Sequence, residues 1–272
     1  MLELTKEKWA KIDNPYGNSE NIPGLIKTLE KTLDKEIFEE LVSGYMYHQG
    51  SLYTATFAAF PYLMQIAENT GNMDFRLDTL LNLGVILSEY TGDNEMNQIF
   101  ENSELDTETV KDIKNSFKIA FKRLNSMAES LMGTILQKKE SDKRYFLLAL
   151  ATANSVYEVS SVLWKYSDNE EYVCVCPECE EEFFLWENNG KLDLYTEDPV
   201  FEKDQKKYPV QPAGLNKTDY SKEIIPSKNY EWLSYYIDKL NIESLKVTIN
   251  YLFGTVVCPC CETKFKVFEN LE

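Results

Sequence analysis

Two short segments of the chain each carry a pair of cysteines arranged like half of a zinc site. Residues 176–188 read CPECEEEFFLWEN and residues 258–270 read CPCCETKFKVFEN, and seven of the thirteen aligned positions are identical. A C-P-x-C turn places two thiolates on one side of a tight bend, and two such bends facing each other form a tetrahedral four-sulfur site. We therefore predict one zinc ion per chain. The predicted ligands are Cys176, Cys179, Cys258 and Cys261.

The other two cysteines have no counterpart in this internal repeat. Cys174 aligns with Val256, and Cys260 aligns with Glu178. The two-residue spacing favours the repeated pairs as ligands, and whether Cys174 or Cys260 takes part stays open at the level of sequence. A site of four thiolates leaves no coordination position for water, so we expect the zinc to be structural rather than catalytic.

Three other roles for the cysteines compete with zinc. Unligated thiols are disfavoured, because the repeat continues past the cysteines into flanking phenylalanine and glutamate positions. An iron–sulfur cluster also accepts four cysteines, but turns at the tips of hairpins are more typical of zinc ribbons. A thioredoxin-like redox motif is disfavoured, because no βαβ pattern surrounds either pair. The cysteines cluster in a chain that shows no apolar signal segment, so we expect a reducing, cytoplasmic location.

The first 166 residues are predicted to be almost wholly helical. The clearest helix covers residues 107–138, where apolar side chains recur every three or four positions. Short connections between the helices favour an all-α layer of antiparallel pairs. Five other helices are predicted in this region. The first opens at Ile22-Pro23, the second begins after a cap at Asp34, and the third begins after a cap at Ser51 and is expected to be kinked or loosened at Pro61. The fourth covers residues 74–90, and the fifth runs from a cap at Ser141 to about Tyr166.

The composition changes at residues 167–170, so we predict one domain over residues 1–168 and a second over residues 169–272. In the second domain, predicted strands flank each cysteine turn and form two hairpins. The stretch of about 189–253 is read as an insertion between them, irregular over 189–229 because of its prolines and helical afterwards. The predicted strands are 172–175, 183–186, 255–257 and 265–268, and the predicted helices begin at Tyr230 and Ile242, the second ending at Gly254.

The charge and the scarcity of histidine narrow the functional classes. The formal net charge is −17, and both predicted domains are acidic, so phosphate backbones would be repelled and nucleic-acid binding is disfavoured. The acidity suits either simple solubility or a basic partner protein. The sequence contains no stretch of eighteen apolar residues, so no membrane-spanning helix is predicted. One histidine, His48, and no nucleotide or nucleophile motif lead us to expect a protein that is not an enzyme.

A set of residues near the N-terminus forms a recognisable combination: Trp9, Tyr16-Gly17, Ile22-Pro23, Leu25, Leu41, His48-Gln49-Gly50, Tyr53, Ala55, Ala58-Ala59, Pro61 and Ile66. Residues 9–70, about a quarter of the chain, thereby resemble a segment that recurs in bacterial HEAT-like α-solenoid proteins. The resemblance implies a helical repeat unit in a soluble bacterial protein. Some members of that group look like immunity proteins that sit beside secreted toxins, and the resemblance supplies no catalytic residues.

Together these features predict a mainly α protein. A HEAT-like α-helical solenoid would be followed by a zinc-ribbon pair of β-hairpins that carries a long insertion. We expect a non-catalytic, zinc-containing protein that binds another protein, with a toxin or other basic protein as the candidate partner and an immunity-type or scaffold role. The alternative is an enzyme, or a thiol-based redox or metal sensor, that uses the cysteine cluster. The oligomeric state stays open.

Overall fold

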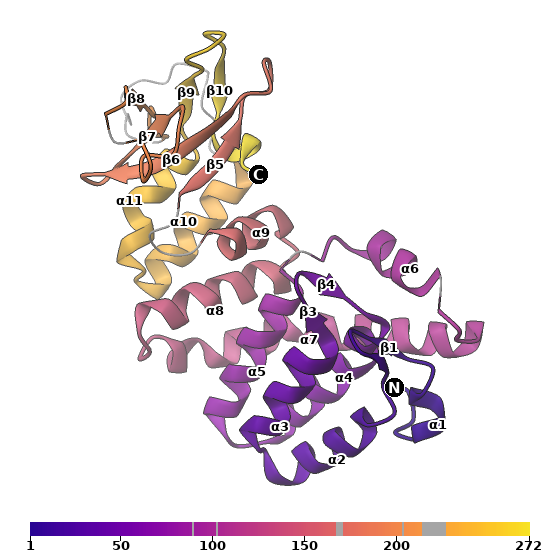
Figure 1. The fold of residues 1–272 in the computed structure, drawn as a ribbon. Coiled ribbons are helices and arrows are strands. Elements are labelled where there is room, and N and C mark those ends of the chain that lie inside the picture. The colour runs from indigo at the N-terminus through magenta and orange to yellow at the C-terminus, as the bar shows by residue number, and fades with distance from the viewer. Residues whose placement is uncertain (89, 102, 167–170, 203, 214–226) are drawn as a thin grey trace. The chain divides into compact units, whose positions relative to one another are not determined.

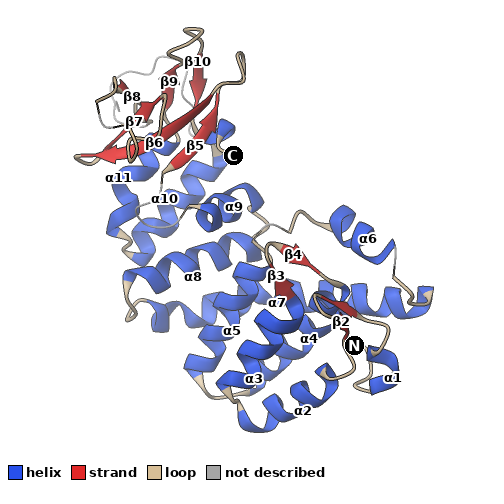
Figure 2. Ribbon diagram, in the orientation of Figure 1, coloured by secondary structure: helices blue, strands red, loops and turns tan. Residues whose placement is uncertain are grey.

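The computed structural model describes residues 1–272 except 89, 102, 167–170, 203 and 214–226 (Figure 1). The chain divides into two compact units, Met1–Ser161 and Val162–Glu272. The predicted domain boundary lies between residues 168 and 169, where the composition changes. These residues are outside the described part of the chain. In the described part of the chain, the first unit is helical apart from short hairpins, and the longer strands belong to the second unit (Figure 2).

The first unit contains a series of helices joined by short connections. No sheet of three or more strands occurs among its described residues, which agrees with the helical prediction. The helices are α1 (Lys6–Trp9), α2 (Ile22–Thr32), α3 (Lys35–Glu39), the π-helix η1 (Glu40–Met46), α4 (Thr54–Asn69), α5 (Met73–Ile86), α6 (Asp93–Glu101), α7 (Thr107–Ile135), α8 (Glu140–Ala153) and α9 (Tyr157–Lys165), which continues into the second unit. The two-residue strands are β1 (Asp13–Asn14), β2 (Gly17–Asn18), β3 (Tyr47–His48) and β4 (Ser51–Leu52).

Two helical hairpins form the centre of the first unit. The α4–α5 hairpin stacks on the α7–α8 hairpin, with α4 against α7 and α5 against α8. Between α4 and α7, the rings of Phe57 and Phe60 meet Phe117 edge-on, with centroids 4.9 and 5.1 Å apart. The backbones of α5 and α8 approach closely at Gly84, which has no side chain. A Cβ added there would lie only 2.4 Å from the Cβ of Ala149.

The start of α4 differs from the prediction. Ser51 was expected to cap this helix, but it lies in β4 and pairs with His48 of β3, and the helix begins at Thr54. The cause is a tight turn at Gln49 and Gly50, both of which have positive φ (48° and 80°). Such a turn closes a two-residue hairpin, so the backbone of Ser51 is committed to the strand. The connector predicted at positions 48–50 is therefore a β-turn, and α4 runs through Pro61 as one continuous helix.

The helix predicted from Ser141 to Tyr166 is wrong in its extent. It consists of α8 and α9, separated by a break in which Ser155 has φ 59°. Apolar side chains continue on both sides of the break, so the hydrophobic pattern alone did not reveal it. Ser141 lies in the first turn of α8 instead of capping it, since Lys139 holds the cap position. Two expectations for the first helices are confirmed: Asp34 caps α3 by accepting from two of its backbone amides, and Pro23 lies in the first turn of α2.

The second unit combines a sheet, a hairpin and two helices. An antiparallel four-stranded sheet has the order β5-β6-β7-β8, and β9 and β10 form a separate antiparallel hairpin. The strands are β5 (Tyr172–Val175), β6 (Glu182–Asn188), β7 (Lys191–Tyr195), β8 (Tyr208–Pro209), β9 (Thr255–Val257) and β10 (Lys264–Lys266), and the helices are α10 (Lys228–Leu240), α11 (Glu243–Leu252) and the 3₁₀ helix η2 (Phe268–Asn270). The predicted strand 265–268 therefore gives way to η2 at its end.

The prediction of an irregular stretch over 189–229 is wrong for its first part. Asn189 and Gly190 both have positive φ (53° and 76°) and close a tight turn between β6 and β7. Asn-Gly is the strongest short hairpin signal in a sequence, and here it extends the sheet by β7. The strand β8 then pairs with β7 through Pro209, which an edge strand tolerates. Residues 214–226 of this stretch lie outside the described part.

One cluster of buried side chains joins the sheet, α11 and the β9–β10 hairpin, and it includes Cys174, Cys176 and Cys258. Gly254 stands at the junction of α11 and β9, just after the helix, as predicted. A Cβ there would lie 2.2 Å from the carbonyl oxygen of Gln211, so only glycine fits. Among the described residues, no helix is both long enough and apolar enough to cross a membrane.

Candidate metal centre

The two cysteine turns lie at the tips of equivalent hairpins. In β5–β6, Cys174 pairs with Phe183, and in β9–β10 the aligned residues Val256 and Phe265 pair in the same way. The other two residue pairs of β9–β10 also have their aligned counterparts paired in β5–β6. The sequence repeat is therefore a repeat of structure, with the same register in both copies. The prediction of hairpins with cysteine turns at their tips is confirmed.

Hydrogen bonds close the two turns in the same way. The N–H of Cys176 donates to the carbonyl of Glu181 at 2.9 Å, and the N–H of Cys258 donates to the carbonyl of Thr263 at 2.8 Å. A second bond in each turn runs back to the carbonyl of the first cysteine, from Glu180 at 2.9 Å and from the aligned glutamate at 3.0 Å. Each turn is thus a closed loop that fixes its two cysteines relative to each other.

The four predicted ligands converge within the second unit. The sulfur atoms of Cys176, Cys179, Cys258 and Cys261 all lie within 4.8 Å of one another. Across the two turns, the sulfurs of Cys176 and Cys261 are 3.6 Å apart, as are those of Cys179 and Cys258. A regular tetrahedron with metal–sulfur bonds of about 2.3 Å has sulfur–sulfur edges of about 3.8 Å. The cluster therefore has dimensions that could hold a metal ion.

Hydrogen-bond donors surround both sulfurs of the second turn, although burial outweighs them at Cys258 and raises the pKa of that thiol. The sulfur of Cys258 lies 3.4 Å from the backbone nitrogen of Cys260 and 3.5 Å from that of Cys261, and accepts from both N–H groups. Hydrogen bonds from the side chain and then the backbone of Thr263 lower the pKa of the Cys261 thiol to about 6. A metal-binding cysteine must be a thiolate, so these donors assist binding. The sequence did not indicate Thr263, because the repeat has Glu181 at the aligned position.

The remaining cysteines lie in different surroundings. Cys174 is fully buried in β5, and its aligned residue Val256 is buried in the same way in β9. Burial raises the pKa of the Cys174 thiol to about 12, so it behaves as an apolar side chain of the core. Cys260 is exposed beside the second turn. The four-sulfur cluster includes neither. His48, the single histidine, lies in the first unit with its ring 5.7 Å from that of Tyr16.

Comparisons of the chain with protein-family models, with curated proteins and with solved structures found no match. Its function is therefore inferred from the chemistry of the cysteine cluster and of the molecular surface.

Proposed function

We propose that the four clustered cysteines hold one structural Zn²⁺ and that the protein acts by binding another protein. The observation that carries the metal assignment is the convergence of four sulfurs from two equivalent hairpins. Seventy-eight residues separate Cys179 from Cys258, so an ion in this position ties the two ends of a long segment together. Metal binding of this kind contributes on the order of 10 kcal/mol, part of which appears as folding free energy.

A binding role follows from what the rest of the chain offers. Four thiolates would leave no open coordination position for a substrate, and the chain has a single histidine, so few groups are suited to catalysis. The stacking of the α4–α5 hairpin on the α7–α8 hairpin supports the proposal of a HEAT-like scaffold. With a net charge of −17, the favoured partner is a basic protein, such as a toxin that an immunity-type protein would neutralise.

A pull-down with the purified full chain tests this proposal. We expect it to recover a basic protein at low ionic strength and to recover less as salt is added, because salt screens the charges that steer the encounter. Recovery of nucleic acid alone, or a protein partner whose association is insensitive to salt, would contradict the proposed mode of binding.

The second candidate function is a thiol-based redox or metal sensor. Two observations favour it: the lowered pKa of Cys261 and the exposed thiol of its neighbour Cys260. Native thiol labelling separates the two functions in a Cys260→Ser background, which removes the exposed thiol. A structural site stays unreactive until a chelator is added. Rapid labelling of Cys261 in the untreated protein, together with release of the metal, would favour the sensor.

A further inference from the structure

The loop that joins β7 to β8 displays an apolar side chain to solvent. Phe201 is 86% exposed, and no other large apolar side chain in the described part of the chain is as exposed. Val200, directly before it, is 54% exposed. Single apolar side chains on a surface are common, so the construction of the loop decides whether this one has a role.

A hydrogen-bonded turn fixes the backbone at Phe201. The carboxylate of Asp198 accepts from the N–H of Val200 at 2.8 Å. The carbonyl of Asp198 accepts from the N–H groups of Phe201 and Glu202, both at 3.0 Å. Three consecutive amides therefore bind to one residue, and the tip that carries Phe201 has a defined conformation.

Gln205 closes the loop that carries this turn. Its amide nitrogen donates to the carbonyl of Glu197 at 2.7 Å and to that of Glu202 at 2.8 Å, and its amide oxygen accepts from the N–H of Glu197 at 3.1 Å. Compact surface loops whose ends are held together are frequently functional. The loop presents Phe201 already ordered, and such preorganisation lowers the entropic cost of binding.

The closed loop is acidic. Residues 197–205 contain four acidic side chains and one basic side chain. Glu197, Glu202 and Asp204 are exposed, and none of the three forms an ion pair within the described part of the chain. Carboxylates that flank an exposed apolar tip are therefore available to cations on another molecule.

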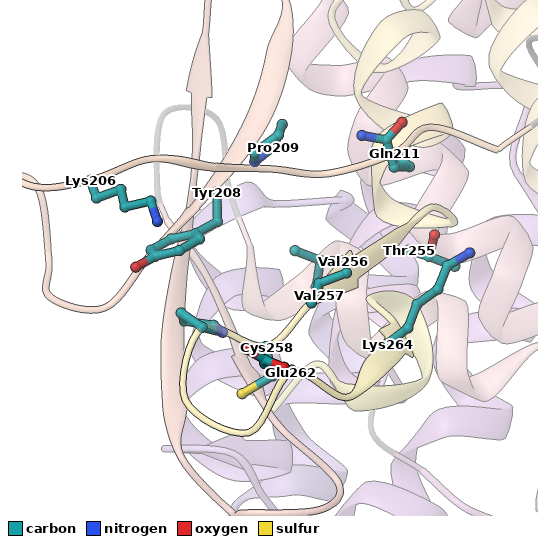
Figure 3. A pocket seen from close by; sticks show the side chains of 11 residues that line it. Lys206, Tyr208, Pro209, Gln211, Thr255, Val256, Val257, Cys258, Glu262 and Lys264 are labelled. Carbon is teal, nitrogen blue, oxygen red and sulfur yellow. The ribbon is translucent and has the colours of Figure 1, made fainter.

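Two lysines, Lys206 and Lys207, follow the segment that Gln205 closes. Lys206 and Tyr208 line a groove of about 350 Å³ beside β9 (Figure 3). The Nζ atom of Lys206 lies 4.7 Å from the centre of the Tyr208 ring, and Figure 3 shows the lysine directed toward that ring. The charge of Lys206 is thus held beside the first residue of β8 and is not paired with a carboxylate of the loop.

We propose that Phe201 is the anchor by which this protein docks onto its partner, entering an apolar pocket rimmed by lysine or arginine. The inference rests on the proposed basic partner and names the surface that meets it. An aromatic side chain buries a large area in one pocket, and a few such residues dominate the affinity of many interfaces. The carboxylates of Glu197 and Glu202 would face the basic rim and steer the encounter. They also disfavour a membrane surface, because anionic headgroups would repel them.

Photo-crosslinking identifies what meets the tip. Phe201→p-benzoylphenylalanine places a photoreactive ring there in the full chain, and the variant is irradiated in the cells that naturally produce the protein. Mass spectrometry identifies the adduct. We expect a protein with more lysine and arginine than aspartate and glutamate. Capture alone does not establish an anchor, so the affinity of the purified partner is then measured by titration calorimetry.

Three variants test the anchor. Phe201→Ala should weaken binding about thirtyfold or more and leave the melting temperature unchanged, because the side chain is almost fully exposed. Gln205→Ala keeps Phe201 but opens the loop, and it should weaken binding about three- to tenfold. Ile119→Ala is the matched control: Ile119 is 64% exposed on α7, and its replacement should change the affinity less than about twofold.

An adduct with lipid, with a second copy of the chain or with an acidic protein, or no adduct at all, would overturn the inference. An affinity that Phe201→Ala or Gln205→Ala leaves unchanged would do the same. If the pull-down still recovers a basic protein that binds Phe201→Ala as tightly as the original, only the anchor is refuted and the proposed function stands. If no basic protein is recovered at all, both are refuted.

Discussion

The residue that follows each cysteine pair adopts a left-handed backbone conformation without being glycine. Glu180 has φ 60° and the aligned Glu262 has φ 62°. This conformation costs a residue with a side chain about 1–2 kcal/mol, whereas glycine adopts it freely but loses more entropy on folding. We predict that Glu180→Gly raises the free energy of unfolding by about 0.5–1 kcal/mol, measured by chemical denaturation.

Glu181→Gly is the control, since it removes the same charge at the next position, where φ is not positive. It should leave the stability unchanged or lower it slightly. If both variants lower the stability equally, the left-handed conformation is not a source of strain in the turn.

The cysteines should divide into two groups when they are replaced. Cys258→Ser removes a proposed ligand, and we predict a loss of about 2–5 kcal/mol in the stability of the second unit, measured by thermal unfolding. Cys174→Val should cost less than about 1 kcal/mol, because valine occupies the aligned position in the other hairpin. Cys260→Ser is exposed and should be near neutral. Equal losses at all three positions would show that the ligands are wrongly assigned.

At the scale of elements, the close approach of α5 and α8 sets a strict requirement. A side chain at Gly84 would overlap Ala149, so we predict that Gly84→Ala lowers the free energy of unfolding by about 1–3 kcal/mol. Gly133→Ala in α7 is the control. Gly133 is exposed with nothing nearby, and alanine should raise the stability by about 0.5–1 kcal/mol. Chemical denaturation of both variants measures the difference, and a stabilising Gly84→Ala would contradict the packing.

Local signals carried most of the element predictions. The apolar period predicted α7, and the repeat predicted both cysteine hairpins, because these depend on nearby residues. The break at Ser155 was missed because apolar residues continue through it, and α6 was missed because only Met96 and Phe100 of that helix are buried. The strand β8 has only two residues and exists because it pairs with β7. A local sequence pattern of two residues cannot predict such a pairing. The convergence of the four cysteines was predictable, whereas the groove beside β9 follows from tertiary pairing alone.

At the scale of the whole molecule, removal of the metal should affect the two units differently. All four clustered cysteines belong to the second unit, and the first unit has its own core of stacked helices. We predict that a strong chelator abolishes amide hydrogen-exchange protection in β5–β10 and α11 while α4, α5, α7 and α8 remain protected. Loss of protection throughout the chain would show that the first unit depends on the metal, and no loss anywhere would show that the second unit folds without it.

The metal content of the purified protein tests the central claim most directly. Elemental analysis combined with X-ray absorption should find one zinc per chain, surrounded by four sulfur atoms at about 2.3 Å. Iron accompanied by sulfide, a zinc with nitrogen or oxygen in place of sulfur, or protein that carries no metal would contradict the account.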